Sequence, residues 1–551
     1  MGLDFDRRRL LVLGAAVVGG GLLGTRILSS RDEIAPAGAS GGGGAPRPGG
    51  EIYYLNAFLN AGWAPSQIGS WHALQVWNLI GEYLFYVNLQ NELTGHLATG
   101  YTADDDFTRF TFALRDDVTF SNGRKLDAEA VALNLDLFGL GDETRGIPKV
   151  ANIPPSYRRT VATAEHEVVV ELDEPFPGFV WQLAGSSNVA ILAPETIGLP
   201  LEQQSDLDNV HGTGPWVPES WVASKEVVLR RREDYAWPRE EELHEGPAYL
   251  ERITVRQVDQ DLLRVGALES GQAHLIHYTQ PSAEDRLAAA GHTIVDTFAS
   301  GSVWCLHIRV NSRFGDDVRV REALNRATDR QQVVDTFYND RWKVAQSPVN
   351  RATPWGLDLS ERFAHDRGRA DELLDEAGWT GRDGDGYRVK DGRTLEFVVY
   401  PSVFITTSRD ALTLLTQQWR SVGVKLTLRN VDYSNYNTTT LANNPDPVQL
   451  YEIHWGASHP ANLWRWWHSS QGNQFGAPAP ELDDLLEQIA QARTEDEAYE
   501  HARQALTFVV DHHYFIPVHE FPQNFAAAAQ LKGVTTDGYP KLRLYDAWLD
   551  V

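Results

Sequence analysis

Cysteine is nearly absent from this chain, which has one, Cys305, among 551 residues. A single cysteine excludes an intramolecular disulfide and every metal motif that needs several thiolates. Basic residues are also in the minority, because 49 Lys and Arg face 75 Asp and Glu, which leaves a formal net charge of −26. Such an acidic chain is a poor match to nucleic-acid phosphates, so we expect no nucleic-acid partner.

The short motifs of common enzyme classes are missing as well. The chain has no Gly-x-Ser-x-Gly elbow, no Gly-x4-Gly-Lys-Ser/Thr phosphate loop and no His-Glu-x-x-His zinc motif. His512, His513, His519 and Glu520 could ligate a metal, but they flank the apolar run 514–518, which favours packing or surface roles. We therefore expect a protein that is not an enzyme and has no cofactor and no metal site.

The N-terminal segment 1–39 has the features of an export signal. Arginines at 7–9 precede the uncharged stretch 10–23, which is shorter than the ~20 residues that a membrane span needs. The order Arg-Arg-x-Leu-Leu resembles a twin-arginine signal, although Asp6 stands where such signals carry Ser or Thr. An ordinary secretory signal or a short anchor remains open. No cysteine directly follows the uncharged stretch, so we expect no lipoprotein. The expected location is exported, periplasmic or extracytoplasmic. An uncleaved signal segment could hold the protein at the membrane.

The Gly- and Pro-rich stretch 40–50 is typical of a flexible linker, and the folded part is expected to begin at Glu51. A chain of this length, with 42% hydrophobic residues and 17 Trp, predicts two to four domains or lobes. Strand and helix patterns alternate along it. Strands are expected at 107–114, 168–172 and 424–428, and helices at 127–138, 317–327 and 369–377, so the fold class is mixed α/β.

Five stretches occur in the order and at the spacing of one known family. They are FTFALRDDVTFSNG (110–123), HGTGPW (211–216), LRRREDY (229–235), VRVREAL (318–324) and LLDEAGW (373–379). Together they resemble the extracellular solute-binding proteins of family 5, the dipeptide, oligopeptide and nickel receptors of ABC importers. The glycines of HGTGPW permit a tight turn, and its proline fixes the next φ.

The resemblance implies a two-lobed clamshell of the periplasmic-binding-protein type (type II, cluster C). The first lobe would comprise 51–92, 210–302 and 521–551. An extra subdomain, 93–209, would be inserted in it, and the second lobe would comprise 303–520. A ligand would lie in the cleft between the lobes, and closure would be a hinge motion.

One region, 453–480, contains no Asp or Glu in a chain that has 75 of them. Its Trp455 follows an expected strand, 449–454, and is a candidate to face the ligand. The peptide binders of the family carry an acidic residue shortly after this tryptophan, whereas this chain has Ser458 and His459. A cationic peptide terminus would lose a charge-assisted hydrogen bond there, which puts ordinary peptides in doubt.

Other candidates for ligand contacts come from the expected strand ends and from the same region. Trp63 follows the first strand, Tyr278 follows the strand 275–277, and Trp304 lies at the expected crossover between lobes. Arg465 is a candidate partner for a ligand carboxylate. Each of these side chains has an alternative role in packing or at the surface.

The leading hypothesis is therefore the substrate-binding protein of an ABC importer, which takes a peptide-like or other small organic solute and delivers it to membrane permease subunits. A nickel or other metal-chelate receptor, with His454 or His459 in the cleft, is the alternative within the family. A ligand sensor and an exported hydrolase are alternatives of other classes. The protein is expected to be a monomer.

Overall fold

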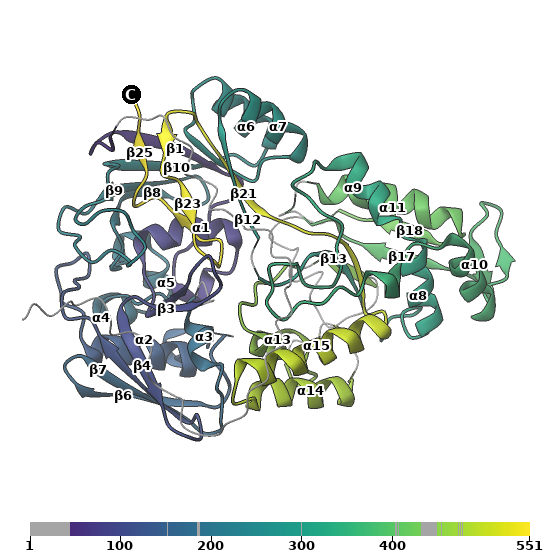
Figure 1. The fold of residues 1–551 in the computed structure, drawn as a ribbon, viewed down its shortest axis with the longest axis horizontal. Helices are drawn as coiled ribbons and strands as arrows, with labels where there is room; N and C mark the ends of the chain where they lie inside the picture. The colour runs from purple at the N-terminus through teal and green to yellow at the C-terminus, as the bar shows by residue number, and fades with distance from the viewer. Residues whose placement is uncertain are drawn as a thin grey trace, which may run out of the picture.

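A computed structural model describes residues 45–551 except 151, 185–187, 299, 403–404, 406, 431–448, 453, 472, 474 and 477. The expected signal segment and most of the linker therefore lie outside the described residues. The three largest sheets organise the described part (Figure 1). We call the seven-stranded sheet I, the five-stranded sheet II and the four-stranded sheet III.

Sheet I draws its strands from distant parts of the chain. Its strands are β1 (Glu51–Asn56), β8 (Trp216–Val222), β9 (Glu226–Arg231), β10 (Arg252–Gln257), β11 (Leu275–His277), β12 (Thr293–Thr297) and β21 (Gln523–Ala527), in the order β12-β21-β11-β1-β10-β9-β8. Strand β1 pairs in parallel with β10 and β11, so the carboxyl ends of these three strands share one edge. Helices α1 (Trp71–Ile80), α6 (Asp261–Glu269) and α7 (Pro281–Ala289) complete this part.

Sheet III is antiparallel, in the order β4-β5-β7-β6. Its strands are β4 (Ala98–Ala103), β5 (Arg109–Leu114), β6 (Tyr157–Ala164) and β7 (Glu167–Leu172). Buried and more exposed residues alternate along β5, as expected when one face is packed and the other is solvated. Helices α2 (Ala128–Leu140) and α3 (Phe179–Ala184) belong to this segment of the chain.

Sheet II has the order β18-β17-β19-β13-β20. Its strands are β13 (Trp304–Ile308), β17 (Glu396–Val399), β18 (Lys425–Leu428), β19 (Leu450–Glu452) and β20 (Phe515–His519). All five residues of β13 are buried, which fits its position inside the sheet. The helices beside it are α8 (Val318–Ala327), α9 (Arg330–Phe337), α10 (Arg367–Glu376) and α11 (Ser408–Ser421).

Three further helices, α13 (Leu463–Trp467), α14 (Pro480–Gln491) and α15 (Glu495–Asp511), lie next to the part that contains sheet III (Figure 1). The chain passes from sheet I to sheet II between β12 and β13, and it returns between β20 and β21. Two connections therefore join the two larger sheets.

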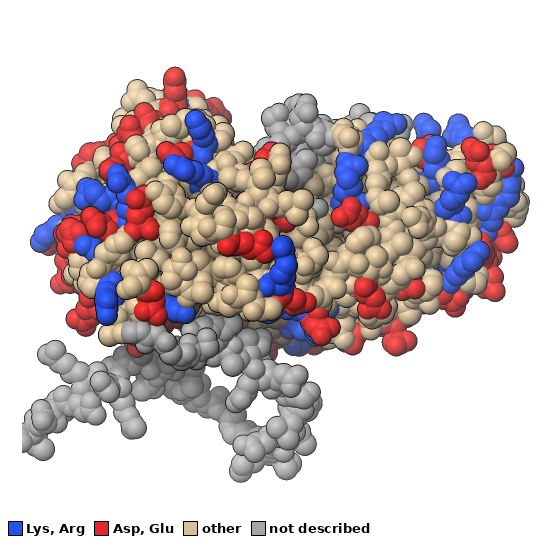
Figure 2. Space-filling model, turned by 90° about the horizontal axis from the view of Figure 1, so that it is seen from above, with Lys and Arg blue, Asp and Glu red and all other residues tan. Residues whose placement is uncertain are grey.

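Several helix starts that the sequence predicts are confirmed. The carboxylate of Asp127 accepts a hydrogen bond from the Ala130 amide at 2.7 Å, and Asp329 accepts one from Gln332 at 3.0 Å. Thr494 caps the long helix α15 in the same way. Across the described residues, no helix is both long enough and apolar enough to cross a membrane. Figure 2 shows acidic and basic side chains interspersed on one face of the molecule.

Candidate functional site

The carboxyl edge of sheet I holds a buried polar cluster. The carbonyl oxygen of the Asn56 side chain lies 2.9 Å from Nδ1 of His72 and 3.4 Å from Nδ1 of His277. The next residue, Tyr278, has a φ of +55°, a left-handed conformation that costs strain for a residue with a Cβ atom. Its hydroxyl donates to Oε1 of Gln523 at 2.5 Å, and its ring stacks on His277 at 4.0 Å. Tyr278 is thus held firmly at the end of β11, against the first residue of β21.

Two of the candidate tryptophans are fully buried, and their indole groups differ in hydrogen bonding. Trp304 donates from Nε1 to Oε2 of Glu452 at 2.9 Å and stacks on His519 at 5.1 Å. Trp63 has no partner for its Nε1 among the described residues. An unsatisfied buried donor carries a desolvation penalty, which a ligand acceptor would remove.

The segment that carries Trp455 is fixed by backbone pairing with residues 300–302. The Trp455 amide donates to Oγ of Ser302 at 2.9 Å, and the Ser302 amide donates to the Trp455 carbonyl at 3.0 Å. Gly301, which directly precedes Ser302, has a φ of +136°. A Cβ atom on this glycine would stand 2.3 Å from the Trp455 carbonyl oxygen. Only glycine allows this close approach. The Trp455 indole is buried edge-on against Trp467, with ring centroids 5.8 Å apart.

Ser458 and His459 follow on the same segment, and both are buried. The Ser458 hydroxyl has no described partner. Nδ1 of His459 accepts a hydrogen bond from the Ala461 amide at 3.2 Å, and its ring stacks on Trp181 of α3 at 5.6 Å. Burial lowers the pKa of His459 to about 3, so this imidazole is neutral at neutral pH.

Arg465 lies on α13, partly buried, and its guanidinium donates to the side-chain carbonyl of Asn152. The guanidinium carbon also lies 4.4 Å from the centroid of Trp466. Burial lowers the pKa of Arg465, and the nearby Tyr539 hydroxyl acts in the opposite direction. Within the described part of the chain, the contacts of this guanidinium are the Asn152 side chain and the Trp466 ring, and no Asp or Glu forms an ion pair with it.

Two aromatic residues at this place were not predicted from the sequence. The rings of Trp71, in the first turn of α1, and Tyr539, near the C-terminus, are 5.2 Å apart. A Cβ atom on Gly456 would lie 2.6 Å from the Tyr539 ring, so the ring packs directly on this glycine. Lys541, which is fully buried, has its ammonium 5.6 Å from the same ring. Their long sequence separations offer no signal that links them before folding.

Buried polar atoms without partners gather around this segment. On this segment they include His454 Nε2, Trp455 Nε1, Ser458 Oγ, Trp464 Nε1 and Trp467 Nε1 among the described residues. Most buried polar groups in folded proteins are hydrogen-bonded, so these atoms are candidates for hydrogen-bond partners that the protein itself does not supply.

In the part of the chain that is described, no group of three or more His, Cys, Asp or Glu side chains is placed to hold a metal ion. Burial, followed by the proximity of His519, lowers the pKa of His454 to about 3.

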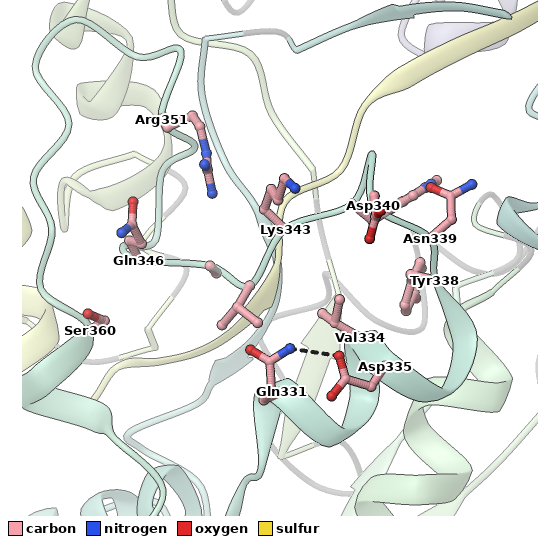
Figure 3. A pocket seen from close by; sticks show the side chains of 13 residues that line it. Gln331, Val334, Asp335, Tyr338, Asn339, Asp340, Lys343, Gln346, Arg351 and Ser360 are labelled. Carbon is pink, nitrogen blue, oxygen red and sulfur yellow. Dashed lines mark hydrogen bonds between the residues drawn. The ribbon is translucent and has the colours of Figure 1, made fainter. Parts of the chain in front are cut away.

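A separate pocket of about 430 Å3 lies beside α9 and the loop that follows it (Figure 3). Lys343, Arg351 and Asp340 are among its lining residues, and Gln331 donates to Asp335 within it at 2.7 Å. None of the residues that the sequence singled out for ligand contacts lines this pocket.

Sequence comparison links the chain to one family and to named relatives. Residues 92–474 match the family model described as bacterial extracellular solute-binding proteins, family 5 Middle. The glutathione-binding protein GsiB of Salmonella paratyphi A is 27% identical over 356 residues, which are 63% of each chain. The nickel-binding periplasmic protein of Escherichia coli is 26% identical over 352 residues, or 60% of this chain and 62% of the relative. The matches thus span less than two thirds of these relatives.

Solved structures share the fold. NikA from Brucella suis, in complex with Fe(III)-EDTA, has a TM-score of 0.77 at 21% identity and covers 91% of this chain and 100% of its own. The oligopeptide-binding protein AppA from Bacillus subtilis, in complex with a nonapeptide, has a TM-score of 0.77 at 18% identity and covers 92% and 99%. The predicted two-lobed α/β fold class is confirmed, and the chain belongs to the bacterial extracellular solute-binding proteins of family 5.

Proposed function

We propose that this chain is the substrate-binding protein of an ABC importer, which holds a small organic solute between two lobes and delivers it to membrane permease subunits. The first lobe is assigned to 51–92, 210–302 and 521–551, with the subdomain 93–209 inserted, and the second lobe to 303–520. Export by the N-terminal segment would place the protein outside the cytoplasm. The proposal involves no covalent step.

The observation that carries this proposal is the set of unpartnered donors around Trp455. Trp455, Ser458 and Trp467 leave buried polar atoms unsatisfied. Tyr539, from the proposed first lobe, packs on Gly456 of the same segment, and Trp71 packs on Tyr539. A ligand that contacts both lobes in the closed state but only one in the open state binds the closed state more tightly, and it therefore favours closure. A micromolar receptor needs about −8 kcal/mol, which buried aromatic area and a few hydrogen bonds can supply.

The experiment is native mass spectrometry of protein purified from its own host. We expect a bound solute whose mass is the same after release as in the complex. A solute released in chemically altered form would contradict the proposal. So would a preparation that binds no solute from the host's own growth medium. Refolded protein that has been freed of solute is the matched control.

A metal-chelate receptor is the second candidate, because relatives in both comparisons are named for nickel. The two candidate histidines differ in their free atoms. Nδ1 of His459 accepts a hydrogen bond from the Ala461 amide, so the proton of the neutral ring is on Nε2. The buried Nε2 of His454, in contrast, has no described partner. A chelate receptor should therefore lose its metal on His454→Ala, measured by metal analysis after gel filtration. Unchanged metal content would exclude His454.

A further inference from the structure

We propose that the ligand of this site is an organic anion that carries a carboxylate or similar group and no charged amine. This inference rests on the proposed function and specifies the chemistry of the same site. It follows from an imbalance between the cations and the carboxylates around Trp455.

The cation is Arg465. Its guanidinium has five N–H donors, and the contacts that the structure shows are the Asn152 carbonyl and the face of Trp466. A partly buried guanidinium without a carboxylate is an incomplete ion pair, since burial removes the water that would otherwise solvate it. A ligand carboxylate bound in bidentate fashion would complete the pair.

The buried carboxylates of the described residues already have partners. Of the acids in the described residues, six are buried: Glu82, Asp261, Glu284, Glu452, Glu520 and Asp537. Three of them pair with arginines, which are Arg264 for Asp261, Arg351 for Glu520 and Arg239 for Asp537.

The other three buried acids accept hydrogen bonds from neutral donors or from histidine, and Nε of Arg341 also lies 3.9 Å from Oε2 of Glu284. Glu82 accepts from Tyr235 at 2.7 Å and lies 3.0 Å from His96. Glu284 accepts from Asn339 at 2.7 Å and Asn524 at 2.5 Å.

Glu452 is the acid nearest to Trp455 in the sequence, and three donors already surround it. The Ser408 hydroxyl lies 2.6 and 2.7 Å from its two oxygens, Trp304 donates at 2.9 Å and the Ser402 amide donates at 3.1 Å. A ligand ammonium would have to displace these donors from a residue that is 2% exposed.

The segment itself adds no negative charge. Residues 453–480 contain no Asp or Glu. Ser458 and His459 are both uncharged at neutral pH, because a serine does not ionise and burial keeps the imidazole of His459 unprotonated. An ammonium group at this place would therefore face Arg465 without a counter-ion, which costs several kcal/mol in a buried site.

The test uses yeast extract as the probe. The extract is passed over a strong cation exchanger at low pH, which retains amines, and the flow-through is divided on an anion exchanger into anions and neutral solutes. Thermal shift of the purified protein is measured with each of the three fractions. The variants Arg465→Gln, Arg465→Lys and Arg503→Gln are tested beside the wild type. Arg503 lies on α15 and pairs with Glu500, so it serves as the matched control.

The anion fraction is expected to stabilise the wild type and Arg503→Gln. For Arg465→Gln, the concentration needed for half of the shift should rise about tenfold or more, with a smaller rise for Arg465→Lys. Stabilisation by the amine or neutral fraction, or an equal response of Arg465→Gln and the wild type, would overturn the inference and leave the proposed function standing. No response to any fraction would count against both.

Discussion

Gly178 lies so close to Ala461 that a Cβ atom on the glycine would stand 2.9 Å from the Cβ atom of the alanine and 3.1 Å from Nδ1 of His459. Gly178 directly precedes α3, on the side of sheet III, and Ala461 lies in the 3-10 turn Pro460–Asn462 that leads into α13. The stacking of Trp181 on His459 adds to the same contact. In the proposed division of the chain this contact joins the two lobes, and we expect it to be lost when they open.

The substitution Gly178→Val should act as a wedge at this contact. Overpacking costs about 1–3 kcal/mol, and we expect this cost to appear as weaker solute binding, because the open form has room for the side chain. The melting temperature of solute-free protein should stay the same. The measurement pairs calorimetric titration with thermal unfolding. Gly100→Val is the control, since a Cβ atom on Gly100 meets nothing within 4 Å. A drop in the melting temperature of the solute-free Gly178→Val protein would show that the contact is permanent packing.

The substitution Trp455→Phe tests the unpartnered indole nitrogen. Trp455 is buried against Trp467, so truncation to alanine would cost about 3–5 kcal/mol of stability and would confuse the result. Phenylalanine keeps an aromatic ring and removes Nε1. We expect solute affinity to fall by about 1 kcal/mol, the value of one hydrogen bond, with a smaller loss of folding stability. Equal calorimetric titrations of the variant and the wild type would remove Nε1 of Trp455 from the site.

A third prediction concerns the pH dependence of stability at Glu284, whose carboxylate binds Asn339 and Asn524. Burial raises the pKa of Glu284 to about 7, and the charge of Asp296 contributes to the increase. The folded state therefore holds this proton at a higher pH than the unfolded chain, whose ordinary value is about 4.3. The free energy of unfolding should decrease as pH rises from about 4.5 to 7, so the protein becomes less stable. Above pH 7 the stabilisation that came from the protonated Glu284 stays lost.

Glu284→Gln should remove that dependence, because glutamine resembles the protonated acid. The stability difference between the variant and the wild type should shift in favour of the variant by about 1–3 kcal/mol between pH 5 and pH 8, measured by urea unfolding. Comparing the two proteins cancels the contributions of groups that do not interact with Glu284, whereas the interactions of Asp296 and Arg341 with this carboxylate are part of the measured difference. A difference that is independent of pH would mean that Glu284 titrates at an ordinary value in the folded protein.

Local signals in the sequence predicted local structure well. The capping residues Asp127, Asp329 and Thr494 were predicted because each cap involves residues only three positions apart. Trp71 and Tyr539 were missed because their contact joins chain segments more than 460 positions apart, and no periodicity encodes it.

The candidate site was predicted only in part, because some of its features are local in the sequence and others depend on long-range pairing. The region around Trp455 was found from its composition, since the absence of acids there is visible in the sequence. The hydrogen bond from Trp304 to Glu452 depends on how β13 and β19 pair, which the sequence does not reveal. Whether the seven predicted side chains touch the solute stays a prediction.

The central claim is that a solute holds the two lobes together and leaves unaltered, and small-angle X-ray scattering tests it most directly. Profiles are recorded for protein as purified from its host, with its solute, and for the same protein after the solute has been removed by unfolding and refolding. The account predicts a smaller radius of gyration with solute present and a return to that value when the released solute is added back. Superimposable profiles with and without solute would contradict it.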